Sequence, residues 1–450
     1  MSLDINQLDT ICALASAKAQ CAISIIRVCG ANTKNILEKI FSKKVKSLKA
    51  THGQITNNKG QIIDDVIVIY YPKNKSFVGL DSLEINCHGN PIIIDEIIER
   101  LKECGARLAE PGEFSMRAVL NGKIDLVQAE SIANLIHAQS SLAKNIALRG
   151  LEGYLSRKIT PIRHSIITIL ANIEARMDFV DEDLGSYDKS ILINNLETNI
   201  LDIKTILKNA DVGLKLYEGA RIVICGEPNA GKSTLLNCLV KDERAIVHES
   251  AGTTRDVIEV NFMLGDIQAT LIDIAGIREF NKASEIEQIG INKAFFELNR
   301  ADIIIWLADA TQAQPFENEE IKEQITKSSA QVIKVLNKVE IAKNCDTNYI
   351  AISAKNNINI DLLINNLSNL LIANTISGEE VFITKKRQKV ELEQALNSLS
   401  LAFDALKLGL VDEIVCFELR AAGTCFDRLL GTKISEDILD KIFSEFCIGK

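Results

Sequence analysis

The chain has 450 residues, 47% of them hydrophobic, and a formal net charge of −9. This length predicts roughly three domains, and the acidic balance argues against a protein that coats nucleic acid through clustered basic residues. The chain contains no signal-peptide pattern, no apolar run long enough to span a membrane and no C-x-x-C spacing, so we expect a cytoplasmic protein with no membrane contact and reduced cysteines.

Residues 1–118 are predicted to form an α+β domain. Three short apolar runs have the length and composition of strands, namely Ala22–Val28, Ile62–Tyr71 and Leu83–Cys87. One stretch, from Pro91 to Cys104, has apolar residues at helical spacing.

Two helical regions flank a region in which strands and helices alternate. Residues 119–217 and 376–450 keep apolar side chains at helical spacing, whereas residues 218–375 alternate between strand and helix patterns. We therefore predict a multidomain protein of α/β and α class. Its α/β domain is inserted between the two parts of one discontinuous helical domain, an arrangement that is favoured when the ends of the insert lie close together.

The most informative segment is Gly226–Ser233, which reads Gly-Glu-Pro-Asn-Ala-Gly-Lys-Ser. It follows the apolar run Ile222–Cys225, typical of a buried strand, and leads into Ser233–Asn237, which has the pattern of the first turns of a helix. A strand, a glycine loop and a helix in this order predict a phosphate-binding loop. In such a loop backbone N–H groups face the phosphates, Lys232 neutralises β/γ oxygens and the Ser233 hydroxyl binds Mg²⁺.

Four further motifs follow in the order expected of a Ras-like GTPase domain. Asp273–Gly276 is a D-x-x-G element, which can hold a magnesium-bound water and meet the γ-phosphate. Gly252–Asp256 has the composition of a switch, in which the Thr254 hydroxyl completes the magnesium shell when the γ-phosphate is present. Asn337–Glu340 and Ser353–Lys355 each follow an apolar run and are predicted to read guanine.

Two residues depart from the usual GTPase pattern. The base-reading motif ends in Glu340 where aspartate is usual; the extra methylene moves the carboxylate by about one bond length, so we expect guanine to be read with weaker discrimination. Ile277 follows the D-x-x-G element, where many GTPases have a glutamine that orients water, so hydrolysis needs help from elsewhere. The acidic segment Ser284–Glu287 can supply a carboxylate, and the alternative for either glutamate alone is a solvated helix face.

Longer matches make the resemblance specific. The motifs above and five longer segments resemble the MnmE (TrmE) family of tRNA modification GTPases, and the resemblance covers nearly the whole chain. The segments are Arg107–Phe114, Asn121–Glu130, Asp273–Glu279, Glu287–Ile291 and Phe446–Lys450. One turn differs, because the family's Pro-Pro-Gly-Arg-Gly-Gly is replaced here by Ala17–Ala22. In the family this turn lies near the folate site. Glycine allows backbone conformations and close approaches that other residues do not, so the loss of these glycines restricts the backbone there.

The resemblance implies a potassium-activated GTPase that acts with an FAD-dependent partner of the MnmG type, in a heterotetramer or larger complex. Together they place a carboxymethylaminomethyl or aminomethyl group on C5 of the wobble uridine of tRNA. The one-carbon donor is 5-formyl- or methylene-tetrahydrofolate, bound by the N-terminal domain, which also forms the homodimer. K⁺ brings two G domains together and stands in for an arginine finger, since a cation offsets charge that develops at the phosphates.

The resemblance also assigns catalytic and ion-binding residues. Glu287 matches the catalytic glutamate, and Glu285 is the reserve candidate because this chain carries extra residues between Arg278 and Glu287. Mg²⁺ is assigned to Ser233 and Thr254. K⁺ is assigned to Asn229, His248, Ser250 and Thr253. His248 and Ser250 stand where the family usually has Thr and Ile.

Folate and GTP contacts are carried over in the same way. The folate contacts are Arg27, Glu84, Lys123 and Lys450, in which cations suit the glutamate tail and a carboxylate suits the pterin ring. The GTP contacts are Asn229, Ala230, Gly231, Lys232, Ser233, Thr234, His248, Glu249, Ser250, Ala251, Gly252, Thr253, Thr254, Asp273, Ile274, Ala275, Gly276, Asn337, Lys338, Glu340, Ser353, Ala354 and Lys355.

Three other functions share parts of this pattern. A GTP-dependent RNA-binding or ribosome-assembly switch has the same G motifs, but it normally carries a basic appendage rather than an acidic helical frame. A folate-dependent transferase would use GTP only structurally. A pure scaffold would not hydrolyse GTP above the uncatalysed rate.

Overall fold

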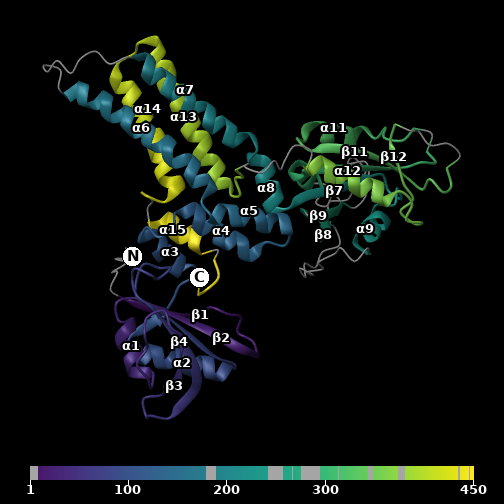
Figure 1. Cartoon of the computed structure of the whole chain (residues 1–450). Coiled ribbons are helices and arrows are strands. Elements are labelled where there is room, and N and C mark those ends of the chain that lie inside the picture. Colours follow the sequence, from purple (N-terminus) through teal and green to yellow (C-terminus); the bar gives the residue numbers. More distant parts are fainter. Residues whose placement is uncertain are drawn as a thin grey trace, which may run out of the picture. The chain divides into compact units, whose positions relative to one another are not determined.

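The computed structural model describes ten stretches of the chain, whose elements are labelled in Figure 1: 9–178, 189–241, 257–265, 267–274, 294–312, 314–342, 348–372, 381–433, 436–444 and 446–449. The chain divides into two compact units. The first comprises Met1–Ile136, Gly150–Leu201 and Val390–Lys450, and the second comprises His137–Arg149 and Asp202–Lys389. The domain limits predicted at 118, 217 and 375 stay predictions.

The N-terminal part of the first unit is a six-stranded sheet of order β3-β4-β5-β2-β1-β6. Its strand β6 pairs parallel with β1, and the other neighbours are antiparallel. The bounds are β1 Thr10–Leu14, β2 Cys21–Cys29, β3 Thr51–Thr56, β4 Ile62–Tyr71, β5 Ser82–Gly89 and β6 Ala106–Leu108.

Two helices, α1 (Thr33–Ile40) and α2 (Pro91–Glu103), bury their apolar stripes in the same core as this sheet. α2 begins where the sequence favours a helix start, because the Asn90 side chain accepts from the backbone N–H of Ile92 and a proline follows Asn90. The strand and helix patterns predicted for this region are confirmed. The prediction of a single helical stretch is wrong, since α1 and α3 (Glu113–Leu120) also form; each has only 8 residues, too few for periodicity to reveal.

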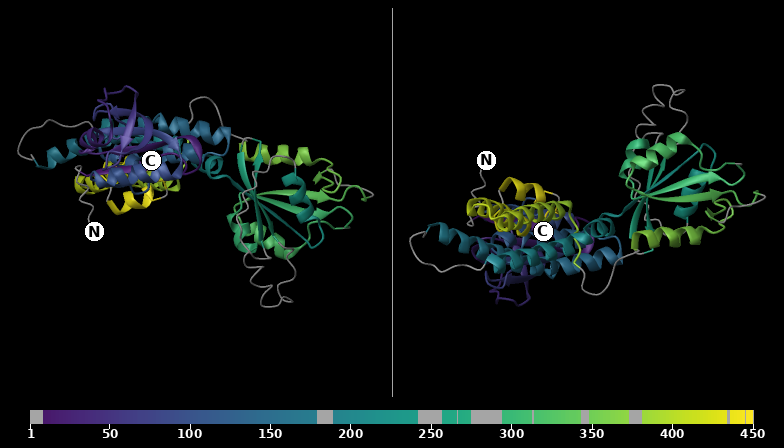
Figure 2. Two further views of the ribbon diagram at one scale, coloured as in Figure 1. Left: turned by 90° about the horizontal axis from the view of Figure 1, so that it is seen from below. Right: turned by 90° about the horizontal axis from the view of Figure 1, so that it is seen from above.

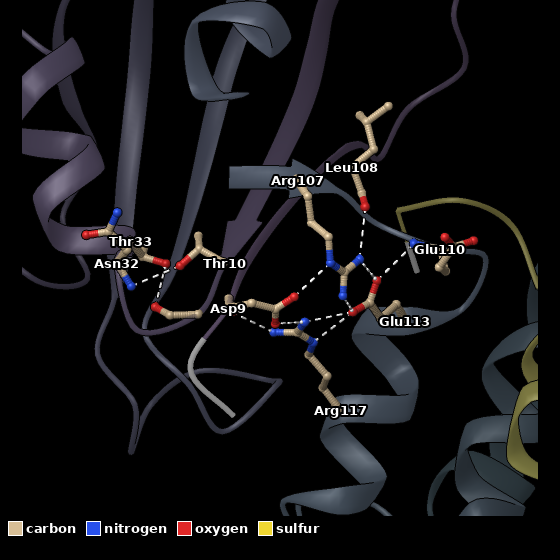
Figure 3. A network of polar contacts seen from close by, with 10 residues as sticks. Asp9, Thr10, Asn32, Thr33, Arg107, Leu108, Glu110, Glu113 and Arg117 are labelled. Atoms are coloured by element: carbon tan, nitrogen blue, oxygen red, sulfur yellow. Dashed lines mark hydrogen bonds and ion pairs between the residues drawn. The ribbon is translucent and has the colours of Figure 1, made fainter. Parts of the chain in front are cut away.

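A buried charge network ties α3 to the sheet (Figure 3). The Glu113 carboxylate accepts from Arg107 at 2.6 and 2.8 Å, from Arg117 at 2.7 Å and from the backbone N–H of Glu110 at 2.9 Å. Asp9 accepts from both arginines. Burial alone raises the pKa of Glu113, but the hydrogen bonds and charges of Arg107 and Arg117, together with the Glu110 N–H, outweigh burial and leave that pKa below 4.5.

We expect Glu113→Gln to destabilise the first unit by about 3 kcal/mol at neutral pH, because it leaves buried guanidinium charge uncompensated. Because the pKa of Glu113 is lower in the folded state than in the unfolded chain, the ionised carboxylate stabilises the fold at pH values above the unfolded pKa. That stability is lost as the pH falls below about 4.5 and through the folded pKa. Urea unfolding of the full chain at pH 7 and pH 4 measures both effects. Glu99→Gln, which removes an exposed pair with Lys102, is the matched control, and equal midpoints for Glu113→Gln and the parent at pH 7 would contradict the assignment.

The helical part of the first unit contains three long helices that lie side by side in Figure 1, namely α6 (Tyr154–Asp178), α13 (Lys386–Leu408) and α14 (Asp412–Leu430). The shorter helices α4 (Leu126–His137) and α15 (Glu436–Phe443) lie beside α3. α6 packs on α14 through buried side chains such as Ile166 and through the ion pair Arg163–Asp427 at 2.6 Å. The described helices include none with the length and hydropathy that a membrane crossing requires.

The second unit holds a second six-stranded sheet, of order β12-β11-β10-β7-β9-β8, which is parallel except for β8. Its strands are β7 Ala220–Gly226, β8 Val257–Leu264, β9 Ile267–Ile274, β10 Ile303–Asp309, β11 Gln331–Asn337 and β12 Ile350–Ala351. The helices of this unit include α5 Ser141–Leu151, α7 Lys189–Lys208, α8 Ala210–Glu218, α9 Lys232–Lys241, α11 Glu319–Lys327 and α12 Ile360–Ile372, of which α5 and α7 lie only partly in it.

Helices cover both faces of this sheet (Figure 2). In β7, Ile222 and Ile224 pack with α9 and α12, whereas Val223 and Cys225 face the opposite core, to which α11 contributes. A strand buried on both faces gives the continuous apolar run seen in the sequence. The predicted α/β pattern, and with it the multidomain α/β and α class, is confirmed.

Candidate active site

The glycine loop lies at the carboxyl end of β7, which is flanked in the sheet by β10 and β9. α9 begins at Lys232, directly after the loop, as predicted. The Lys232 ammonium is buried and donates to the carbonyls of Gly226 at 3.1 Å and Glu227 at 3.0 Å. Burial lowers the pKa of Lys232, so the loop holds a desolvated cation that an anionic ligand would stabilise.

Close packing makes glycine necessary at position 231. Gly231 has φ +95°, and a Cβ there would lie 2.2 Å from Nδ2 of Asn337. The preceding Asn229 also has a positive φ, +66°, and asparagine tolerates that region better than most residues. These conformations turn the loop around a centre that backbone N–H groups can face.

Asp273 and Ser233 meet beside this loop. The parallel register of β7 and β9 places Asp273 opposite Ile224, and the Ser233 hydroxyl donates to Asp273 Oδ2 at 2.7 Å. Asp273 Oδ1 is buried and has no hydrogen-bond partner among the described residues, and burial raises the pKa of this carboxyl. A hydroxyl and a carboxylate with a free oxygen fit the hard oxygen ligands that Mg²⁺ takes, directly or through water.

Asn337 joins the phosphate loop to the base-reading segments. Its side chain is buried, donates to the Ala230 carbonyl at 2.9 Å and accepts from the Ala354 N–H at 3.0 Å. The next residue, Lys338, forms an ion pair with Asp309 at 2.6 Å, between the ends of the paired strands β11 and β10. Burial raises the pKa of Asp309, but Lys338 and Thr311 outweigh burial and lower it overall.

Glu340, the unusual residue of this motif, is exposed and interacts with the second base-reading segment. A hydrogen bond from Ser353 is the main cause that lowers the pKa of Glu340, and the charges of Lys355 and Lys338 act in the same direction. The carboxylate is therefore ionised at neutral pH and interacts with Ser353.

The structure thus brings the described members of the predicted GTP contacts to one edge of the parallel sheet. They are Asn229, Ala230, Gly231, Lys232, Ser233, Thr234, Asp273, Ile274, Asn337, Lys338, Glu340, Ser353, Ala354 and Lys355. Eleven predicted site residues lie outside the described residues: His248, Glu249, Ser250, Ala251, Gly252, Thr253, Thr254, Ala275, Gly276, Glu287 and Lys450. The reserve Glu285 lies outside them as well.

The first unit contains a cavity of about 570 Å³ whose lining includes Arg27 and Glu84. The Arg27 guanidinium donates to Glu84 Oε1 at 3.0 Å, and the Tyr71 hydroxyl donates to Glu84 Oε2 at 3.1 Å. Arg27 also reaches the carbonyl of Gly449 at 3.4 Å, which brings the C-terminal residues to this side of the sheet. Lys123 donates to the Asn74 carbonyl at 3.5 Å, next to the lining segment that starts at Lys75. Three of the four predicted folate contacts are therefore neighbours of one cavity.

Sequence reasoning missed Asp309 and the residues of the cavity wall. Asp309 ends an apolar run, Ile303–Ala308, and so has the same pattern as the motifs that were identified, which was a usable signal. Tyr71 ends the predicted strand Ile62–Tyr71, but nothing in the sequence links it to Glu84. Ser115 lies in a short helix without any motif.

Comparison with known proteins identifies relatives of this chain. The family model described as "MnmE helical domain" matches residues 126–447, and the model described as "GTP-binding protein TrmE N-terminus" matches residues 10–123. Three proteins named tRNA modification GTPase MnmE are similar over 98% of this chain. They come from Natranaerobius thermophilus (35% identical, 99% of the relative), Aquifex aeolicus (36%, 100%) and Pseudothermotoga lettingae (37%, 100%).

Proposed function

Because the chain belongs to the MnmE family of tRNA modification GTPases, we propose that it hydrolyses GTP in a potassium-dependent way to modify the wobble uridine of tRNA. The observation that carries the proposal is the convergence of Lys232, Asp273 and Asn337 at one edge of the parallel sheet. This edge combines a buried cation, a pair of hard oxygen ligands and a base-reading segment. Together they suit a magnesium nucleoside triphosphate.

Lys232 performs the charge-neutralising step. Its ammonium bonds only to carbonyls among the described residues, so it can turn to β- and γ-phosphate oxygens, which are stronger acceptors. Ser233 and Thr254 would ligate Mg²⁺ directly, and Asp273 would hold a water in its shell. Mg²⁺ supplies charge neutralisation of the phosphates. Asn337 keeps the loop and the Ala354 N–H in fixed positions while the base binds.

We further propose that Glu287 orients the attacking water and that K⁺ binds at Asn229, His248, Ser250 and Thr253. The oxygen and amide donors of this set suit an alkali cation, and His248 makes the affinity particular to this chain. K⁺ supplies positive charge where negative charge develops in the transition state. Two G domains pair across this region, in the role that an arginine finger has elsewhere.

The cavity of the first unit is the proposed tetrahydrofolate site. Its volume, about 570 Å³, falls within the usual range for small-molecule pockets, roughly 300–1,000 Å³. Arg27, Lys123 and Lys450 would meet the carboxylates of the glutamate tail, and Glu84 would meet the pterin ring. The donor is 5-formyl- or methylene-tetrahydrofolate, and the N-terminal domains pair in a homodimer.

The proposed partners are an FAD-dependent protein of the MnmG type, in a heterotetramer or larger complex, and tRNA in the cytoplasm. With a net charge of −9, this chain contacts tRNA locally or shares it with the partner. The test is reconstitution with that partner, tetrahydrofolate donor, GTP and unmodified tRNA, followed by mass spectrometry of the nucleosides. A modified wobble uridine is expected. Unmodified tRNA despite intact GTP hydrolysis would favour the alternative, an RNA-binding or ribosome-assembly switch.

Restoring the usual base-reading residue should sharpen selectivity. We expect Glu340→Asp to increase the preference for GTP over ITP by about tenfold, since a shorter carboxylate can pair with both guanine N–H groups and ITP lacks the 2-amino group. Competition of GTP and ITP for a fluorescent guanine nucleotide measures the ratio. Glu323→Asp on α11, an exposed glutamate paired with Lys327, is the control. An unchanged ratio would mean that Glu340 does not contact the base.

A further inference from the structure

The turn that follows β10, residues Asp309–Gln312, contacts two segments of the nucleotide site. The backbone N–H of Ala310 donates to the Asn337 carbonyl at 2.8 Å, at the end of the paired strands β10 and β11. The Gln312 side chain donates to the carboxylate of Glu227 in the phosphate loop at 2.8 Å. The turn is therefore placed to set the positions of both segments.

Both oxygens of the Asp309 carboxylate are engaged. Oδ1 accepts from the backbone N–H of Thr311 at 2.9 Å and from the Thr311 hydroxyl at 2.7 Å. Oδ2 accepts from the Lys338 ammonium at 2.6 Å. Because Thr311 orients the carboxylate independently of Lys338, Asp309 offers that lysine a fixed anchor. Both side chains are partly buried, so water and salt screen the pair less than an exposed one.

Lys338 has a backbone conformation that lysine rarely adopts. Its φ is +68°, in the left-handed region, where the Cβ of an L-residue is crowded. Relaxation of Lys338 to an ordinary conformation would redirect the chain after Asn337 and so move Glu340. The neighbouring backbone bond, from the Val339 N–H to the Ile352 carbonyl, is 3.3 Å long. The charge-assisted bond to Asp309 is much shorter and is the stronger restraint.

We propose that Asp309 is a positioning residue for guanine nucleotides, which holds Lys338 and thereby keeps the segment Asn337–Glu340 in the conformation that binds the base. The inference rests on the proposed function of this site in GTP binding. Asp309 contacts the base-reading segment and not the phosphate-binding Lys232. Its contribution is therefore to binding of the nucleotide in the ground state and the transition state alike, which changes KM and leaves kcat.

Asp309→Asn tests this role. The substitution keeps the shape and an oxygen that can accept from Thr311, but it turns an uncharged amide toward Lys338. We expect the dissociation constant for a fluorescent GDP, and KM for GTP hydrolysis by the full chain in potassium buffer, each to rise about tenfold. We expect kcat to stay within about twofold of the parent value.

Asp302→Asn is the matched control, because Asp302 stands just before β10 at the opposite end of the same strand. Asp302 pairs with Lys215 at 3.1 Å and accepts from the backbone N–H of Arg221 at 2.9 Å. Its side chain is 19% exposed, against 16% for Asp309. We expect similar falls in melting temperature in the two variants, and unchanged KM and GDP affinity in Asp302→Asn alone.

The outcomes separate the inference from the proposed function. Parent-like affinity and KM in Asp309→Asn, or a fall in kcat at unchanged KM, overturn the positioning role and leave GTP binding at this site standing. An equal loss of affinity in Asp302→Asn assigns the effect to general stability and overturns the role as well. If the parent neither binds GDP nor hydrolyses GTP, the proposed function fails and the inference fails with it.

Discussion

Replacing Lys232 with alanine is expected to lower kcat/KM for GTP hydrolysis about a thousandfold, the scale found when a charged group is removed from a developing phosphoryl charge. The buried ammonium, with its pKa lowered by burial, is bonded only to carbonyls among the described residues. It is therefore placed to meet phosphates at little cost in reorganisation. The variant should fold, because it removes a desolvated cation rather than an apolar group.

Steady-state phosphate release at saturating and limiting GTP measures this effect. Lys322→Ala is the control, since that lysine lies on the surface of α11 and pairs with Glu319. Lys232→Arg keeps the charge, but its larger planar head does not fit the same loop, and it should lose most of the activity. Parent-like hydrolysis in Lys232→Ala would show that this loop does not bind the triphosphate.

The second large effect concerns Asn337, and it combines stability with binding. Asn337→Ala leaves the Ala230 carbonyl and the Ala354 N–H without their partner in the interior. We expect a loss of about 2–3 kcal/mol in the free energy of unfolding, and a loss of about a hundredfold or more in GTP affinity. The phosphate loop and the Ser353–Lys355 segment, which are proposed to contact the nucleotide, lose their shared anchor.

Asn337→Asp separates the two effects. It keeps the acceptor for Ala354 but places a carboxylate oxygen against the Ala230 carbonyl, so repulsion should loosen the phosphate loop. Asn366→Ala removes an exposed side chain that donates to the Leu362 carbonyl within α12, and it should change neither quantity. Guanine nucleotide titration and urea unfolding give the two values. An Asn337→Asp variant with normal affinity would contradict the anchoring role.

The sequence predicted which of these residues meet at one edge of the parallel sheet, because they follow one rule. Each motif stands at the end of an apolar run, and parallel strands bring their carboxyl ends to one edge, so chain order alone places Lys232, Asp273 and Asn337 together. The same rule explains why Asp309 could have been found. The strands of the N-terminal sheet could also be predicted from the sequence, because apolar runs of this length and composition fit few structures other than a strand.

The remaining features depend on contacts between residues that are distant in the sequence. Glu113 meets Asp9 through two arginines, and no local pattern encodes that network. Likewise, Tyr71 and Ser115 line the same cavity from a strand and a short helix. Which residues line a cavity depends on packing in three dimensions, which is why Ser115 carried no sequence signal.

Potassium-dependent GTP hydrolysis, with Glu287 as the catalytic glutamate, is the activity proposed for this chain. The most direct test is the rate of GTP hydrolysis by the purified chain in potassium and in sodium buffer at equal ionic strength, with Glu287→Ala alongside. We expect faster hydrolysis in potassium and loss of that stimulation in Glu287→Ala. Equal rates in both salts would contradict this proposal, and would mean that this chain, with His248 and Ser250 in the ion site, hydrolyses GTP without potassium.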